Sequence, residues 1–137
     1  MPVFVDSSAL LAVLNRNDLW AVRAACSWRR LVEDQEALTT TSYVVLETVS
    51  IVQRRIGLDA VRVLCDALLP LIEVAYVDID LHAAAVSNLL VANRRELSLV
   101  DCCSFEYMRR SRLFKAFAYD KHFEEQGFEC CDDLPPS

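Results

Sequence analysis

Short apolar runs that alternate with helix-like segments constrain the fold of this chain more than any other feature. Val3–Val5 is a β-branched and aromatic run typical of a buried strand. Runs at 37–40, 71–77 and 116–119 predict three more strands, and 128–131 indicates an edge strand. Strands separated by helices predict a mostly parallel sheet with helices on both faces, an α/β three-layer sandwich.

The segments between the strands have the capping residues and apolar periodicity of helices. They predict helices over 9–14, 18–34, 42–56, 59–69, 80–93 and 99–110, and a helical turn over 121–126. The expected N-caps are Ser7 or Ser8, Asp18, Thr41 or Ser42, Asp80 and Ser98. The expected buried stripe of the second helix is Ala21, Ala24, Ala25, Trp28, Leu31 and Val32, with Ser27 on the opposite face; that of the third is Val45, Val49, Val52 and Ile56.

The size and composition fit one globular domain over residues 1–137, with 134–137 as a flexible tail. The chain has 137 residues, of which 54% are hydrophobic, enough for a core without disulfide support. Its six cysteines form no CxxC pattern, so we expect idle thiols rather than a zinc site. Two glycines are too few for a glycine-rich phosphate loop. No secretory signal and no membrane-spanning run is visible, so a cytoplasmic protein is expected.

Four acidic residues are predicted to meet at one edge of the sheet. Asp6 and Asp120 each follow a strand, and Glu47 and Asp101 stand early in helices that begin near the same edge. Each has an ordinary alternative. Asp101 completes a capping box with Ser98, Asp6 and Asp120 can form turns, and Glu47 can be a solvated helix residue.

Such a meeting is unfavourable without cations. Two carboxylates about 4 Å apart repel by about 4 kcal/mol at an effective dielectric constant of 20, so a cluster of four binds protons or metal. Oxygen ligands suit Mg²⁺ or Mn²⁺. The two histidines, His82 and His122, lie on different segments, which disfavours histidine-based zinc or catalysis.

Four segments resemble the motifs of PIN domains, in order and over essentially the whole chain. They are Val3–Leu10, Thr39–Glu47, Leu97–Phe105 and Ala118–Phe123 followed by Gly127-Phe128. The resemblance implies a PIN-like sandwich and an Mg²⁺- or Mn²⁺-dependent endoribonuclease, similar to the VapC-type toxins of toxin–antitoxin pairs. It carries the metal-binding and catalytic roles onto Asp6, Glu47, Asp101 and Asp120. Of these, we expect Asp6, Asp101 and Glu47 to hold the metal directly, and Asp120 to act through water or on a second ion.

The net charge of −6 does not by itself indicate a nucleic-acid-binding protein. If RNA is the substrate, basic residues are needed to guide it to the acidic site. The candidate substrate-binding residues are Ser7, Ser8, Arg54, Arg94 and Arg109, although the serines can be helix caps and the arginines a solvated helix face. Three alternatives stay open: a housekeeping RNA-processing nuclease, an inactive module that binds RNA or a partner, and an aspartyl-phosphate enzyme. The last is disfavoured because Ser8 stands where a second aspartate is expected.

The resemblance also implies two protein partners, an antitoxin and a second copy of the chain. A mean hydropathy of +0.24 suggests more apolar surface than one small sheet covers. The candidate exposed patch is Leu19, Trp20, Val22, Val44, Leu46 and Ile51, although a large private core would explain the same residues. An antitoxin arm with Arg or Lys is expected to pair with Asp6, Glu47 and Asp101 and to displace the metal.

Overall fold

One five-stranded parallel sheet forms the centre of the computed structural model, which describes residues 2–132. Its strands are β1 (Val3–Val5), β2 (Leu38–Thr41), β3 (Ile72–Ala75), β4 (Lys115–Phe117) and β5 (Glu129–Cys130). They lie in the order β3-β2-β1-β4-β5, and every pairing is parallel. The predicted parallel sheet is therefore confirmed.

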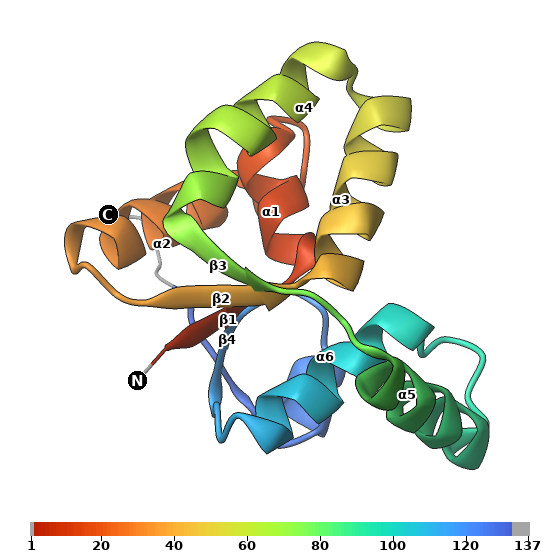
Figure 1. The fold of residues 1–137 in the computed structure, drawn as a ribbon. Helices are drawn as coiled ribbons and strands as arrows, with labels where there is room; N and C mark the ends of the chain where they lie inside the picture. Colours follow the sequence, from red (N-terminus) through yellow and green to blue (C-terminus); the bar gives the residue numbers. More distant parts are fainter. Residues whose placement is uncertain (1, 133–137) are drawn as a thin grey trace.

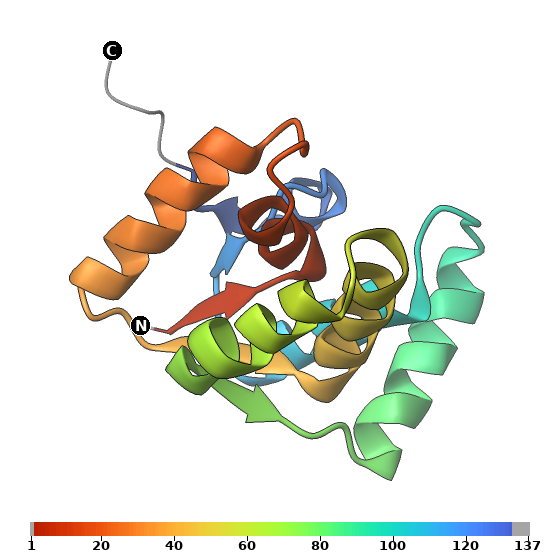
Figure 2. The same ribbon diagram turned by 90° about the horizontal axis from the view of Figure 1, so that it is seen from above.

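Helices cover both faces of this sheet, which gives three layers. Figure 1 shows α1 (Ser7–Leu14), α2 (Ala21–Glu33), α3 (Ser42–Arg55) and α4 (Leu58–Val63) on one face. On the opposite face lie α5 (Ile79–Ala92) and α6 (Leu99–Arg110). Seen from above in Figure 2, α1 to α4 lie over the strands, and α5 extends beyond their carboxyl ends. The short helix α7 (His122–Glu125) connects β4 to β5.

The strand order reverses between β1 and β4. The chain adds β2 and then β3 on one side of β1, and it returns to place β4 on the other side. The backbone N–H of Asp6 continues the β1–β4 pairing by donating to the Phe117 carbonyl at 3.0 Å. In open α/β sheets, ligands bind at the carboxyl ends of the strands next to such a reversal. This edge carries Asp6 and Asp120.

The core fills both faces of the sheet with large apolar side chains. Phe4, Phe117, Phe123, Leu10 and Met108 are completely buried. The Phe4 ring lies 6.1 Å from the Phe123 ring, so α7 packs directly beneath β1. The predicted strand 3–5 is buried at every position, which is the pattern of a central strand covered on both faces.

Several helix starts differ from the sequence expectation. Asp6, not Ser7 or Ser8, is the N-cap of α1. Asp78, not Asp80, caps α5 and accepts the Leu81 N–H at 2.8 Å. Asp18 accepts the N–H of Trp20 at 2.8 Å in a turn before α2, whose N-cap is Trp20. At α1 and α5 more than one polar residue is available near the start and a different one from that predicted accepts the capping hydrogen bond, whereas α2 has no side-chain cap.

The predicted apolar stripes of α2 and α3 are partly wrong. In α2 the buried residues are Ala24, Ser27 and Leu31, whereas Ala25 and Val32 are exposed. In α3 they are Val44, Thr48 and Val52, so the buried face is turned by about one residue from the predicted Val45, Val49, Val52 and Ile56. Both helices have apolar residues on more than one face, and their polar buried residues have partners; Thr48, for example, donates to the Val44 carbonyl.

The connection before β3 is more irregular than the single helix predicted over 59–69. After α4 the chain forms a π-helical turn, η1 (Leu64–Leu68), and then a 3₁₀ turn, η2 (Leu69–Leu71). Pro70 lies in this last turn, and proline disrupts regular helical hydrogen bonding. Residues 134–137, predicted to be a tail, lie outside the described residues.

The predicted exposed patch is also partly wrong. Leu19, Val22 and Leu46 are exposed, but Val44 is fully buried, and Trp20 packs against the core. Ile51 is half-buried. No described helix is long and apolar enough to cross a membrane.

Candidate active site at the carboxyl edge of the sheet

Asp6 stands at the centre of the acidic edge because β1 ends there and α1 begins. Its side chain is 2% exposed. The Ser8 backbone N–H and hydroxyl both donate to Oδ2, at 3.1 and 2.6 Å. The other oxygen, Oδ1, is buried and has no hydrogen-bond partner among the described residues. A buried carboxylate oxygen without a partner is costly, so this atom indicates a missing ligand.

Glu47 reaches the same region from the second turn of α3. The Ser7 hydroxyl donates to its Oε1 at 2.5 Å, which joins α3 to the start of α1. Both serine hydroxyls therefore donate to carboxylates. The expected cap role falls to Asp6, and the two serines hold Asp6 and Glu47 in place.

Asp101 is fixed by a capping box at the start of α6. Its backbone N–H donates to the Ser98 Oγ at 3.0 Å, and its Oδ2 accepts the Ser98 N–H at 3.2 Å. The predicted capping box is confirmed. The capping box uses only one carboxylate oxygen of Asp101, so the other oxygen is left for a metal ion. The residue itself is 8% exposed.

Asp120 lies in the loop after β4, where the sequence places it. Its Oδ1 accepts the His122 backbone N–H at 3.0 Å, and the His122 ring nitrogen Nε2 is 3.9 Å away. The His122 ring is buried, and Nδ1 lies 3.1 Å from the Glu125 carboxylate. His122 thus holds the loop and α7 together.

The charges of neighbouring acids act on Asp6 and on Asp101. Burial, together with the charges of Asp101 and Asp120, raises the pKa of Asp6 to about 7, although the Ser8 hydrogen bonds lower it. Burial also raises the pKa of Asp101, and the charges of Asp120 and Glu47 add to this shift. The structure therefore places the four predicted acids within interaction range at one edge.

The same residues fit a divalent cation in their chemistry but are not closed around one. Within residues 2–132, no group of three His, Cys, Asp or Glu side chains is arranged to hold a metal ion as it stands. Glu47, Asp101 and Asp120 each turn one oxygen toward a protein donor and keep the second oxygen outside these bonds. The oxygen-only ligands and the unpartnered Oδ1 of Asp6 fit Mg²⁺ or Mn²⁺, which hard oxygen ligands bind best.

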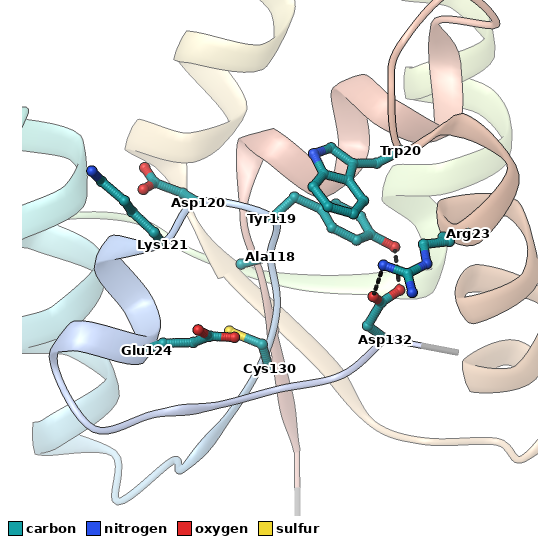
Figure 3. A pocket seen from close by; sticks show the side chains of 9 residues that line it. All are labelled: Trp20, Arg23, Ala118, Tyr119, Asp120, Lys121, Glu124, Cys130 and Asp132. Carbon is teal, nitrogen blue, oxygen red and sulfur yellow. Dashed lines mark hydrogen bonds and ion pairs between the residues drawn. The ribbon is translucent and has the colours of Figure 1, made fainter. Parts of the chain in front are cut away.

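A cavity of about 300 Å³ opens beside Asp120. Figure 3 shows Asp120 and Lys121 on one side of it, Arg23 and Asp132 on the other, and the Tyr119 ring between them. The Trp20 and Tyr119 rings stack with centroids 5.2 Å apart and planes 8° from parallel. Sequence reasoning missed this cavity, because Trp20 and Tyr119 are far apart in the chain and Trp20 was placed in an exposed patch.

The predicted guide arginines do not contact the acids in the described structure. Arg94 pairs with Glu96 at 2.8 Å and with Glu125 at 3.4 Å. Arg109 donates to Gln126 and lies over the Phe128 ring. Arg54 is exposed in the last turn of α3, about 10 Å along the helix axis from Glu47. Their role in RNA binding stays a prediction.

Comparison with known proteins agrees with the fold and with the order of the motifs. The PIN domain family model matches residues 3–129. The chain belongs to the PIN-domain family. The predicted resemblance is thereby confirmed. The chain is 32% identical over 127 residues to the 23S rRNA-specific endonuclease VapC20 of Mycobacterium tuberculosis, covering 92% of this chain and 95% of that protein.

Solved structures give the same result. The crystal structure of Mycobacterium tuberculosis VapC20, a toxin that cleaves the sarcin–ricin loop, superposes with a TM-score of 0.79 and 28% identity, covering 96% of this chain and 99% of that one. FitAcB of Neisseria gonorrhoeae (TM-score 0.67, 14% identity, 96% of each chain) shares the fold. VapBC2 of Rickettsia felis, solved with a DNA fragment from its promoter, also shares the fold, with a TM-score of 0.70 and 10% identity. The match covers 97% of this chain and 100% of that one.

Proposed function

We propose that this protein is an Mg²⁺- or Mn²⁺-dependent endoribonuclease and the toxin of a toxin–antitoxin pair. One observation carries the chemistry: the buried Asp6 has an oxygen without a partner within residues 2–132, beside the charges of Asp101 and Asp120. Its relative VapC20 acts on 23S rRNA, which makes a structured rRNA loop the first substrate to test.

Asp6, Asp101 and Glu47 hold the metal in this proposal, and Asp120 acts through water or on a second ion. A bound divalent cation supplies an acidified water as nucleophile and neutralises charge on the phosphodiester. The chain supplies the geometry. Ser8 fixes Asp6, Ser7 fixes Glu47, and Ser98 fixes Asp101. Because one Asp6 oxygen is already satisfied by Ser8, the other is left for the ion.

Cleavage of RNA tests the proposal. The wild type is expected to cut an rRNA fragment that contains the sarcin–ricin loop with Mg²⁺ or Mn²⁺, and to stop when EDTA is added. Asp6→Asn and Asp101→Asn are expected to lose cleavage with the fold retained by circular dichroism. Asp66→Asn, which changes an exposed aspartate on η1, is the matched control and keeps activity. Cleavage that survives EDTA contradicts the mechanism, and RNA binding without cleavage supports the inactive module instead.

The antitoxin part of the proposal rests on the relatives and on exposed apolar residues. Leu19 and Val22, on or just before α2, are 87% and 65% exposed, and Leu46 on α3 is 66% exposed. We propose that a small protein encoded next to this one covers this surface and places an Arg or Lys among the acids. A homodimer is part of the same proposal.

Co-expression with the neighbouring gene product tests the partner. Copurification and inhibition of cleavage are expected, and Leu46→Asp is expected to weaken copurification while the isolated chain still cuts RNA. A neighbouring product that neither copurifies nor inhibits contradicts the toxin assignment and favours a housekeeping RNA-processing nuclease. Size-exclusion chromatography with light scattering decides whether the isolated chain is a dimer.

A further inference from the structure

We propose that the cavity beside Asp120 binds an unpaired RNA base next to the phosphodiester that the acidic edge cleaves. The proposal rests on the ribonuclease function above. It adds a base-binding subsite formed by Trp20 and Tyr119.

The aromatic wall of the cavity has the chemistry that holds unpaired bases. Trp20 and Tyr119 are both half-buried, so their stacked pair is still accessible to solvent. Aromatic side chains bind single-stranded RNA by stacking on its bases, and RNA sequences are read mostly where bases are unpaired. The cavity, at about 300 Å³, is at the small end of ligand sites, which suits one base better than a peptide or a duplex.

The pair is held rigidly before any ligand binds. The Tyr119 hydroxyl donates to Asp132 at 3.2 Å, and Asp132 pairs with Arg23 at 3.2 Å. The Arg23 guanidinium also lies 5.5 Å from the Trp20 ring centroid. A wall fixed in this way loses little conformational freedom when a base stacks on it, which favours binding.

The cavity shares Asp120 with the acidic edge, and hydrogen bonds link its wall to Asp6. The Tyr119 N–H donates to the Ser8 Oγ at 2.9 Å, and this hydroxyl donates in turn to Asp6. Asp120 lines the cavity and also acts on the pKa of Asp6. A phosphate held at the acids therefore places the base of the same or the next nucleotide at Tyr119.

The charges around the cavity match the two ends of a nucleotide. Glu124 offers an acceptor to the N–H groups of a base edge, whereas Asp132 is engaged by Tyr119 and Arg23. Lys121 lies on the Asp120 side of the cavity, as Figure 3 shows, where a cation can meet the phosphate. In this proposal the aromatic wall faces the base and Lys121 faces the phosphate, while the second cation of the lining, Arg23, is paired with Asp132.

A direct binding test uses the two tryptophans, Trp20 and Trp28, of the full chain. Nucleoside 5′-monophosphates are titrated with Mg²⁺ while the two indole N–H signals are followed by NMR, with Trp20→Phe for assignment. The Trp20 signal is expected to shift with the nucleotides but not with ribose 5-phosphate. Trp28, which stacks on the buried Phe117, is the internal control. Equal shifts with ribose 5-phosphate, or none with any nucleotide, overturn the proposal.

A cleavage test then locates the subsite. Bases around the cleaved bond are replaced one at a time by abasic nucleotides. In the wild type, one position is expected to lose roughly 5- to 150-fold in kcat/KM, mainly through KM. Trp20→Ala should lose a similar factor in kcat/KM on intact RNA, and removing the base at that position should then lower its kcat/KM no further. Trp20→Phe should retain most of the wild-type kcat/KM. Asn17→Ala, an exposed residue in the same loop, is the control.

The two tests separate this proposal from the ribonuclease function. Abasic losses that are unchanged in a folded Trp20→Ala protein overturn the base subsite and leave the ribonuclease intact. Absence of cleavage by the wild type overturns the ribonuclease function, and the NMR titration still decides whether the cavity binds bases.

Discussion

Replacing Asp6 with asparagine in metal-free protein should stabilise the fold at high pH. The carboxylate is buried and its pKa is raised from 3.8 to about 7, so at pH 8 the folded protein holds a charge that the unfolded chain accommodates more easily. Asparagine keeps an oxygen to accept the two Ser8 hydrogen bonds and carries no charge. The substitution therefore removes the cost of the charge and leaves the local contacts.

The sign and size of the effect follow from proton linkage. Between pH 3.8 and about 7 the folded state keeps a proton on Asp6 that the unfolded state has lost, so the stability of the wild type falls as pH rises. The raised pKa of Asp6 costs the folded state about 4 kcal/mol at pH 8, where the carboxylate is ionised in both states. At pH 5 it costs about 2 kcal/mol, because folding then requires the carboxylate to take up a proton. Asparagine should raise the free energy of unfolding by these amounts, and the difference of about 2 kcal/mol between the two pH values is independent of how well the amide fits.

Urea and thermal unfolding in EDTA at pH 8 and pH 5 measure this difference. The expected gain for Asp6→Asn at pH 8 is about 14 °C in Tm, and about half of that at pH 5. Asp66→Asn, an exposed aspartate, is the control and should change Tm little at either pH. A variant that is less stable than the wild type at both pH values, by the same amount, refutes the reasoning.

Three further predictions follow from the same geometry. At pH 8, Mg²⁺ at 100 times its Kd should stabilise the folded wild type by about 3 kcal/mol, whereas the stability of Asp6→Asn should not change. Thermal melts measure both, and an equal rise in Tm in the two proteins would place the ion elsewhere. At low Mg²⁺, cleavage should increase as pH rises through about 7, where Asp6 loses its proton. Ser8→Ala should move the midpoint of this pH profile upward, because the lost Ser8 hydroxyl bond lowers the pKa of Asp6. A midpoint that is unchanged in Ser8→Ala argues against Asp6 as the titrating group. Ser98→Ala should cost about 1 kcal/mol in urea unfolding through loss of the α6 cap, and an unaltered midpoint would show that the capping box is not stabilising.

The positions of the acids at the sheet edge could be predicted because they depend on short-range signals. Asp6 and Asp120 directly follow apolar runs, and parallel strands end at a common edge. Asp101 stands three residues after Ser98, which is the spacing of a capping box. Such features need no knowledge of how the helices pack.

The details around the acids depend on tertiary packing and could not be predicted. Periodicity placed Ser27 on the solvent face of α2, yet it is buried and interacts with Tyr119 across the fold. In the sequence, Trp20 stands between Leu19 and Val22 and resembles part of an exposed apolar patch. In the structure it stacks on Tyr119, a residue far away in the chain. The serines after Asp6 suggested helix caps, whereas the bend at the end of β1 gives that role to Asp6.

A crystal structure grown with Mn²⁺ tests the central claim most directly, because the anomalous signal of manganese locates the ion without reference to activity. We predict an anomalous peak at bonding distance from Asp6 Oδ1, the oxygen that has no partner among the described residues, with Asp101 and Glu47 turned toward it. A well-ordered crystal at saturating Mn²⁺ with no peak at Asp6, or with the ion bound away from these acids, would contradict the account.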